Sequence, residues 1–103
     1  MNQSLLTATR QKDRTQVSFA PVLDVAGAVE LKKQLEKLFR RKPPFELDGS
    51  DIERVDTAAL QVLLAFSRES RDRDIDLEWS GVSDSLRSAS TLLGLAQELG
   101  ISN

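Results

Sequence analysis

A short acidic segment in the middle of the sequence carries the side chains that could do chemistry. Asp48, Ser50 and Asp51 fall within four residues, and Asp56 and Thr57 follow shortly after them. One interpretation is a magnesium or phospho-aspartate site, because open α/β sheets place such sites at the carboxyl ends of their strands. The other is structural, with Asp48 and Asp56 accepting hydrogen bonds from backbone N–H groups of a tight loop. We favour the structural interpretation and expect neither a metal ion nor another cofactor.

The residue types that the chain lacks exclude further chemistry. Its 103 residues include no Cys and no His, which excludes disulfides, thiolate zinc sites, cysteine nucleophiles and imidazole acid–base catalysis. No lysine follows Lys42, so the late lysine of a phospho-aspartate receiver site is missing. With no Tyr, one Trp and four Phe, we do not expect an aromatic platform for single-stranded nucleic acid. The sequence therefore excludes these catalytic groups and predicts no nucleic-acid partner. We also expect a protein that is not an enzyme.

Thr57 is the remaining residue whose chemistry fits a function. It stands in the first turn of a predicted helix, directly after Asp56, which is a short acceptor of the kind that caps helices. In the structural interpretation its hydroxyl is a second cap. In the functional interpretation it is a phosphoacceptor, because a phosphate at a helix N-terminus meets free backbone N–H groups and the positive end of the helix dipole.

The net charge of −2 hides an asymmetry along the chain. Residues 1–42 hold nine Lys/Arg and four Asp/Glu, whereas residues 43–103 hold five Arg and twelve Asp/Glu. The basic groups at 32–33 and 40–42 are typical of a solvated helix face, although they could also contact an acidic partner. Five acids directly before Thr57 would attract a basic partner and make its binding salt-dependent. This predicted acidic rim consists of Glu46, Asp48, Asp51, Glu53 and Asp56.

The hydrophobic pattern predicts an α/β domain in the order ββαβαβα, formed by residues 1–103 as a single unit. Strands are expected at 5–9 and 15–20, which would pair as a hairpin at one sheet edge, and at 45–48 and 75–79. Helices are expected at 26–41, at about 57–71, and from Ser83 or Asp84 to Leu95. A loop at 49–55 and a turn at Gly81 complete the expected organisation.

The helix expected at 57–71 has an apolar first half. Eight of the nine residues at 58–66 are apolar, which is wider than the stripe of roughly 100° that a surface helix needs. We expect a core helix, with Ala58 or Val62 available to a partner protein. The segment is too short for a membrane span, which needs about 20 residues, and no signal peptide is visible. We expect a cytoplasmic protein without membrane insertion, and core positions at Leu60, Leu63, Leu64, Phe66 and Trp79.

The segment Asp48–Leu60 resembles the signature of STAS domains, the family of the anti-sigma factor antagonists and of the cytoplasmic domains of sulfate transporters. Leu23-Asp24-Val25 and the late segments at 82–87 and 92–95 also fit, so the resemblance covers nearly the whole chain. It implies a four- to five-stranded mixed sheet packed with three to four helices. The matching positions of the signature are Asp48, Ser50, Ile52, Val55, Asp56, Thr57 and Leu60.

The resemblance also implies a site. Thr57 matches the residue, usually Ser, that an anti-sigma factor kinase phosphorylates. Asp24 and Asp56 match acids on the same switch surface, and residues 58–60 match a helix start that contacts partners. The candidate partner-binding residues are Asp24, Asp48, Ser50, Asp56, Ala58, Ala59 and Leu60.

Two functions follow from the resemblance. In the first, the unmodified protein binds an anti-sigma factor with serine/threonine kinase activity, or a related signalling kinase, and phosphorylation of Thr57 weakens the complex. In the second, the chain is the soluble STAS subunit of a lipid-transport ABC system and binds its ATPase, with Thr57 as a contact residue. The Thr-Ala-Ala sequence at 57–59 is similar to this second group. Similar small domains also act with chemotaxis components.

Overall fold

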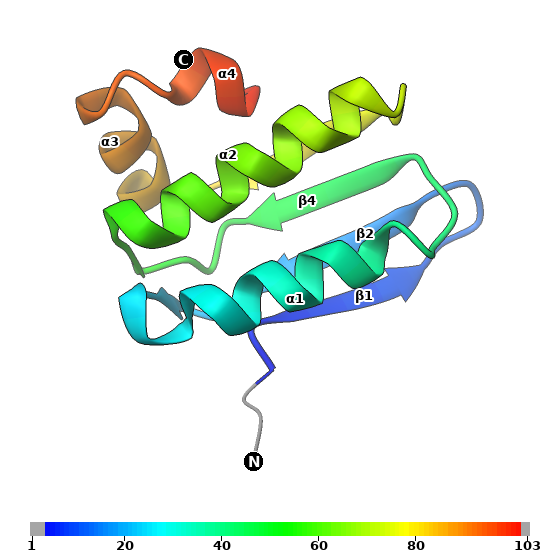
Figure 1. Ribbon diagram of the computed structural model, residues 1–103, viewed down its shortest axis with the longest axis horizontal. Coiled ribbons are helices and arrows are strands. Elements are labelled where there is room, and N and C mark those ends of the chain that lie inside the picture. Colours follow the sequence, from blue (N-terminus) through cyan, green and yellow to red (C-terminus); the bar gives the residue numbers. More distant parts are fainter. Residues whose placement is uncertain (1–3, 102–103) are drawn as a thin grey trace.

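A four-stranded mixed sheet organises the molecule, which the computed structural model describes from residue 4 to residue 101. β1 runs antiparallel to β2, whereas β4 runs parallel to both β2 and β6. The predicted α/β class, mixed sheet and edge hairpin are therefore confirmed (Figure 1). In sheet order, the strands are β1 (Leu6–Arg10), β2 (Thr15–Phe19), β4 (Phe45–Gly49) and β6 (Leu77–Val82).

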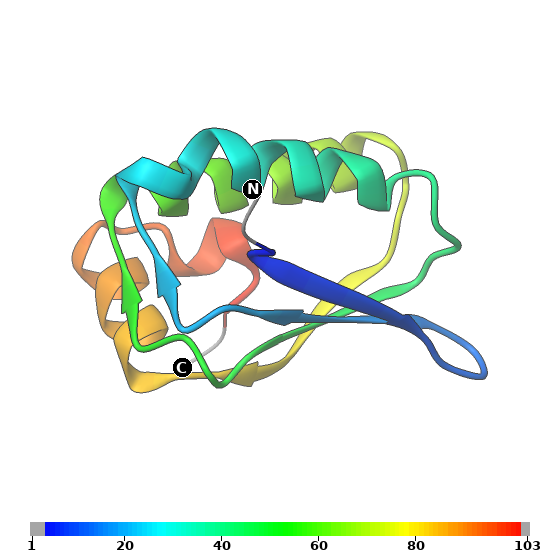
Figure 2. The same cartoon turned by 90° about the horizontal axis from the view of Figure 1, so that it is seen from below.

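Two long helices cover one face of this sheet. α1 (Ala28–Leu38) precedes β4, and α2 (Thr57–Asp72) connects β4 to β6. Both lie side by side over the sheet in the two views, as expected where helices join parallel strands (Figures 1 and 2). After β6 the chain forms α3 (Asp84–Leu92) and the short α4 (Ala96–Leu99), and α4 packs against both α2 and α3.

The core lies between the sheet and the two long helices. Strand alternation turns Phe45 and Leu47 inward, where they are buried, and turns Glu46 to the opposite face. The prediction that α2 is a core helix is confirmed. Within the described residues, no helix is long and apolar enough to cross a membrane. The buried apolar residues of α2 are Ala59, Leu60, Leu63, Leu64 and Phe66.

Trp79 belongs to this core, as predicted. Its ring stacks on that of Phe19, with 5.9 Å between the centroids. Its indole N–H donates a hydrogen bond of 2.9 Å to the backbone carbonyl of Leu99. A Trp side chain buries a large apolar area while its N–H needs an acceptor, so this one residue ties the end of α4 to the sheet.

The end of the sheet differs from the expectation at Gly81, which lies inside β6 rather than in a turn. The strand spans Leu77–Val82 instead of 75–79, and its pairing with β4 shifts register between Leu47 and Asp48. A Cβ atom at Gly81 would lie 2.6 Å from Oδ1 of Asp48. Glycine at this position leaves room for the Asp48 carboxylate of the neighbouring strand, which cannot be read from a turn propensity.

Two further differences concern short elements. The segment expected as a loop at 49–55 contains β5 (Arg54–Val55), which pairs in parallel with β3 (Val22–Leu23). The third helix ends at Leu92 rather than Leu95, because Gly94 adopts a φ of 69° and turns the chain toward α4. β3, β5 and α4 are too short to show a hydrophobic period in the sequence, so their formation depends on tertiary contacts.

Candidate functional site

The pairing of β3 with β5 brings together two segments that are far apart in the sequence. β3 leads into the short 3₁₀ helix η1 (Val25–Gly27), and β5 leads into α2. At the end of the pair, the Asp56 N–H donates to the carbonyl of Leu23 at 3.1 Å. Asp24 and Asp56 therefore begin neighbouring helical turns at one end of the molecule (Figure 1).

The Asp56 carboxylate joins these two turns directly. Its Oδ1 accepts the Ala59 N–H at 3.1 Å, which caps α2, and its Oδ2 accepts the Val25 N–H at 2.7 Å, which holds η1. Asp24 caps its own turn more weakly, since its Oδ1 accepts the Gly27 N–H at 3.3 Å. The helix-capping role predicted for Asp56 is confirmed, and its second bond to η1 was not foreseen.

Thr57 is the first residue of α2 and is exposed. Its hydroxyl has no hydrogen-bond partner among residues 4–101, so the side chain is not used as a second cap. Ala58 beside it is half-buried, whereas Ala59 and Leu60 are 0% exposed. Burial removes Ala59 and Leu60 from any direct contact surface, because the first turn of α2 directs them into the core. Ala59 and Leu60 instead pack in the core beneath the first turn of α2.

Asp48 and Ser50 form a separate local structure at the end of β4. Asp48 Oδ1 accepts the Ser50 hydroxyl at 2.6 Å and the Ser50 N–H at 3.0 Å. The hydroxyl bond, then the N–H bond, lower the pKa of the Asp48 carboxyl below its ordinary value, against the opposing effect of burial. This is the loop-stabilising role expected for Asp48, and the carboxylate lies against Gly81 of β6 rather than beside Thr57.

Three of the five acids of the predicted acidic rim are engaged within the protein, whereas Asp51 and Glu53 are exposed. Glu46 faces the outer side of the sheet, where it pairs with Arg14 and accepts a hydrogen bond from Gln16. Asp48 is engaged by Ser50, and Asp56 by two backbone N–H groups. Among residues 4–101, no three Asp or Glu side chains are grouped closely enough to hold a metal ion.

Exposed valines near Thr57 are the feature that sequence reasoning missed. Val25 in η1 and Val29 in the first turn of α1 are each 69% exposed. Val29 lies outside the buried stripe of Leu31, Leu35 and Leu38, and this offset was a signal in the sequence. We call Val25, Val29, Asp56, Thr57 and Ala58 the docking end of the molecule.

A second exposed apolar group occurs on α3, which lies at the same end of the molecule as the starts of α1 and α2 (Figure 1). Leu92 in the last turn of α3 is 86% exposed, and Leu93 after it is 43% exposed. Large apolar side chains exposed on a small monomer indicate a contact surface when several gather in one region. The apolar surface at this end is thus contributed by three elements.

Comparison with known proteins decides the family. A family model described as "Mlab, STAS domain" matches residues 6–101. The chain belongs to the STAS domain family. The resemblance of the Asp48–Leu60 segment to the STAS signature is thereby confirmed, and the β3–β5 pair and α2 are the parts of this STAS domain that position Asp24, Asp56 and Thr57.

Two solved structures share the STAS fold. An anti-sigma factor antagonist from Mycobacterium paratuberculosis is 19% identical with a TM-score of 0.75, over 89% of this chain and 79% of that chain. A sulfate transporter family protein from Wolinella succinogenes is 26% identical with a TM-score of 0.67, over 82% of this chain and 70% of that chain. The comparison with curated proteins gave no match.

Proposed function

We propose that this STAS domain is a non-catalytic, cytoplasmic regulatory protein whose partner binds the docking end, and that phosphorylation of Thr57 weakens the complex. The observation that carries the proposal is the position of Thr57. Its hydroxyl is exposed and unbonded within the described residues, and it directly follows the carboxylate that holds both η1 and α2. A kinase can reach the hydroxyl without unfolding any element.

The effect of a phosphate follows from the contacts of Asp56. Phosphorylation adds about −1.5 to −2 charge units at neutral pH. The phosphate and the Asp56 carboxylate would compete for the same N–H groups at the start of α2 and would repel each other. Because Asp56 also binds the Val25 N–H, this repulsion would disturb η1 and its exposed valine. One modification thereby alters both the charge and the apolar contacts of the docking end.

One of the two structural relatives supports a partner of the anti-sigma factor type. It is described as an anti-sigma factor antagonist, a protein that acts on an anti-sigma factor. In the proposed cycle the partner kinase supplies ATP and magnesium, and this chain supplies only the acceptor hydroxyl. A phosphatase restores the unmodified, binding form.

The test is to incubate the purified protein with ATP and the kinase encoded beside it, and to map the phosphate by mass spectrometry. Thr57 is expected to carry it, and the Thr57→Ala variant is expected to carry none. The affinity of the kinase for the unmodified and phosphorylated protein is then compared by calorimetry. Phosphate on another residue, or equal affinities, would contradict the proposal.

A second function is favoured by the apolar character of the docking end. Val25, Val29 and Ala58 suit a permanent contact, such as that of a soluble subunit with the ATPase of a lipid-transport ABC system. Thr57 would then be a contact residue that never carries phosphate. Co-purification with an ATPase, and an envelope defect in a Thr57→Ala strain, would favour this function. A Thr57→Glu variant distinguishes the two functions, because only the phosphorylation hypothesis predicts that this variant behaves like the phosphorylated protein.

A further inference from the structure

The second half of α1 and the turn after it carry a dense group of cations, and we call residues 32–42 the basic segment. Six of its eleven residues are Lys or Arg, and one, Glu36, is acidic. Because Leu35 and Leu38 face the core, the helix directs the cations outward. All six are exposed: Lys32, Lys33, Lys37, Arg40, Arg41 and Lys42.

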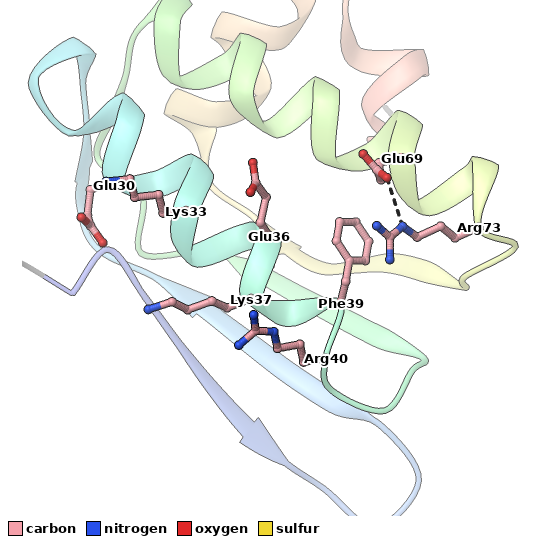
Figure 3. A pocket seen from close by; sticks show the side chains of 8 residues that line it. All are labelled: Glu30, Lys33, Glu36, Lys37, Phe39, Arg40, Glu69 and Arg73. Atoms are coloured by element: carbon pink, nitrogen blue, oxygen red, sulfur yellow. Dashed lines mark hydrogen bonds and ion pairs between the residues drawn. The ribbon is translucent and has the colours of Figure 1, made fainter.

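Most of these cations have no ion-pair partner in the part of the chain that the structure describes. Among residues 4–101, the ion pairs of the basic segment reduce to one long contact of 3.9 Å between Lys32 and Glu36. Figure 3 shows Glu36 pointing toward α2, whereas Lys37 and Arg40 extend from another side of α1. The charges of Lys37 and Arg40 are therefore not neutralised by the acid closest to them in sequence.

The other acids beside α1 are already engaged. A hollow of about 660 Å³ between α1 and α2 contains Glu30 and Glu69 as well as cations (Figure 3). Glu69 binds Arg73 at 3.1 Å, and Glu30 accepts a hydrogen bond of 3.1 Å from Gln34. Glu69 is therefore neutralised by Arg73, whereas Glu30 keeps its charge, and among residues 4–101 no ion pair joins either acid to the basic segment.

The fold gains little from this accumulation of charge. Lys33 and Lys37 are four residues apart, and like charges at that spacing destabilise a helix. The helix dipole favours cations only in the last turn, where Lys37 lies. Most of these charges are therefore available to an anion from outside the chain.

The β1–β2 hairpin extends the same surface. Arg10 Nη1 donates to the carbonyl of Lys42 at 3.0 Å, which holds the hairpin beside the turn after α1. The tip of the hairpin adds the exposed Lys12. Lys33, Lys37 and Arg40 line the hollow between α1 and α2, whereas Arg41 and Lys42 lie on the turn after α1 and Lys12 on the hairpin, so the cations cover a broader surface than the hollow alone.

We propose that the basic segment binds the surface of a bilayer that contains anionic lipids. Groups of about four to eight Lys/Arg on an amphipathic helix suit an anionic leaflet. A protein–protein interface normally needs an apolar centre, which the basic segment lacks. Leu35 and Leu38 are buried, and Phe39 is covered by the Arg73 guanidinium at 4.1 Å from its ring centroid. An extended layer of lipid phosphates fits this arrangement better than a partner protein does.

The geometry leaves the docking end free when the basic segment is occupied. α1 begins at the docking end and finishes in the basic segment, at the opposite end of the molecule in Figure 1. Lys32 and Lys33 lie one helical turn from Val29, so the separation holds for the cations at 37–42, and lipid binding through these cations leaves the docking end free. The inference does not depend on which partner the docking end selects.

Vesicle sedimentation with the full chain tests the proposal. Protein is mixed at low ionic strength with vesicles of phosphatidylcholine alone, or of phosphatidylcholine with phosphatidylglycerol. Binding is expected only with phosphatidylglycerol, and raised salt is expected to release the protein. Each cation near an anionic membrane strengthens binding about fivefold, so the double variant Lys37→Gln/Arg41→Gln is expected to bind about 25-fold more weakly.

The matched control is Arg54→Glu, at an exposed position in β5 outside the basic segment. Both variants change the net charge from −2 to −4, since two cations are neutralised in one and one is reversed in the other. Circular dichroism checks that both are folded. Unchanged binding by Arg54→Glu supports the proposal. An equal loss in both variants, no binding to phosphatidylglycerol vesicles, or equally tight binding to soluble polyglutamate would overturn it.

Discussion

The Asp56 carboxylate makes two hydrogen bonds that join η1 to α2. Replacing Asp56 with Ala removes the acceptor for Ala59 N–H and for Val25 N–H. Loss of a helix N-cap costs about 1 kcal/mol, within a range of about 0.5–2. We expect Asp56→Ala to lower the free energy of unfolding by about that amount in urea titrations, and to weaken partner binding because η1 is released.

Asp24→Ala is the comparison for this variant. Asp24 makes one side-chain bond of 3.3 Å within its own turn, so its removal should cost less than the removal of Asp56. If Asp24→Ala destabilises the protein as much as Asp56→Ala does, the bridging role of Asp56 is wrong.

Asp48 gives a prediction about pH. Its pKa lies below the ordinary value because Ser50 donates two hydrogen bonds to the carboxylate. A lowered pKa in the folded state means that ionised Asp48 stabilises the fold above about pH 3.9, the unfolded value. This contribution is lost as the pH falls through the folded pKa. Ser50→Ala is expected to raise the pKa of Asp48, measured by NMR titration of its carboxyl carbon, and to reduce stability at neutral pH.

The control for this titration is a variant that leaves the Ser50 hydroxyl in place, in which the midpoint of Asp48 should not move. An unchanged Asp48 midpoint in Ser50→Ala would show that the hydroxyl does not hold the carboxylate in solution.

At the scale of elements, the first turn of α2 carries both residues that stabilise the core and residues that are exposed to a partner. Leu60 is fully buried, and replacing a buried Leu with Ala costs about 2–5 kcal/mol. Thr57→Ala, on the exposed face, should change stability by no more than about 0.5 kcal/mol. We expect urea titrations to show this contrast, and the folded fraction of Leu60→Ala to keep its affinity for the partner. If the Leu60→Ala protein is folded but no longer binds the partner, Leu60 contributes directly to partner binding and this prediction is wrong.

The long elements could be predicted from sequence because their periods are local. In α1, α2 and β4, the spacing of apolar residues along the sequence is enough to predict which side chains are buried. β3 and β5 have two residues each, so no period exists, and their pairing depends on chain segments about 30 positions apart. Gly81 was misplaced for a related reason: what selects glycine there is the Asp48 carboxylate on the neighbouring strand.

The candidate site was predictable in part. The motif placed Asp56 and Thr57 at a helix start, as the structure has them. It did not reveal that residues 59 and 60 of the same motif point inward, since a motif does not distinguish contact from support. The exposure of Val29 could be predicted from its offset from the leucine stripe of α1, whereas Val25 lies in a three-residue helix that is too short to show a stripe.

For the whole molecule, charge and apolar surface are separated along α1. The docking end presents exposed valines, and its one carboxylate, Asp56, is bound to backbone N–H groups. The opposite end presents the exposed cations of the basic segment. The predicted acidic rim would have made partner binding salt-dependent, but Glu46 and Asp48 are engaged elsewhere. The structure therefore separates two interactions with different physical origins.

Salt can distinguish these two interactions in one preparation of the protein. Exposed charges are screened over about 8 Å at physiological ionic strength, whereas apolar burial is not weakened by added sodium chloride. We expect partner affinity, measured by calorimetry, to change less than about threefold between low and high salt, because it rests on apolar contacts. Vesicle binding should fall steeply over the same range. If salt dissociates the partner complex as steeply as it releases the protein from vesicles, partner binding is electrostatic. The acidic residues near Thr57 would then be its source.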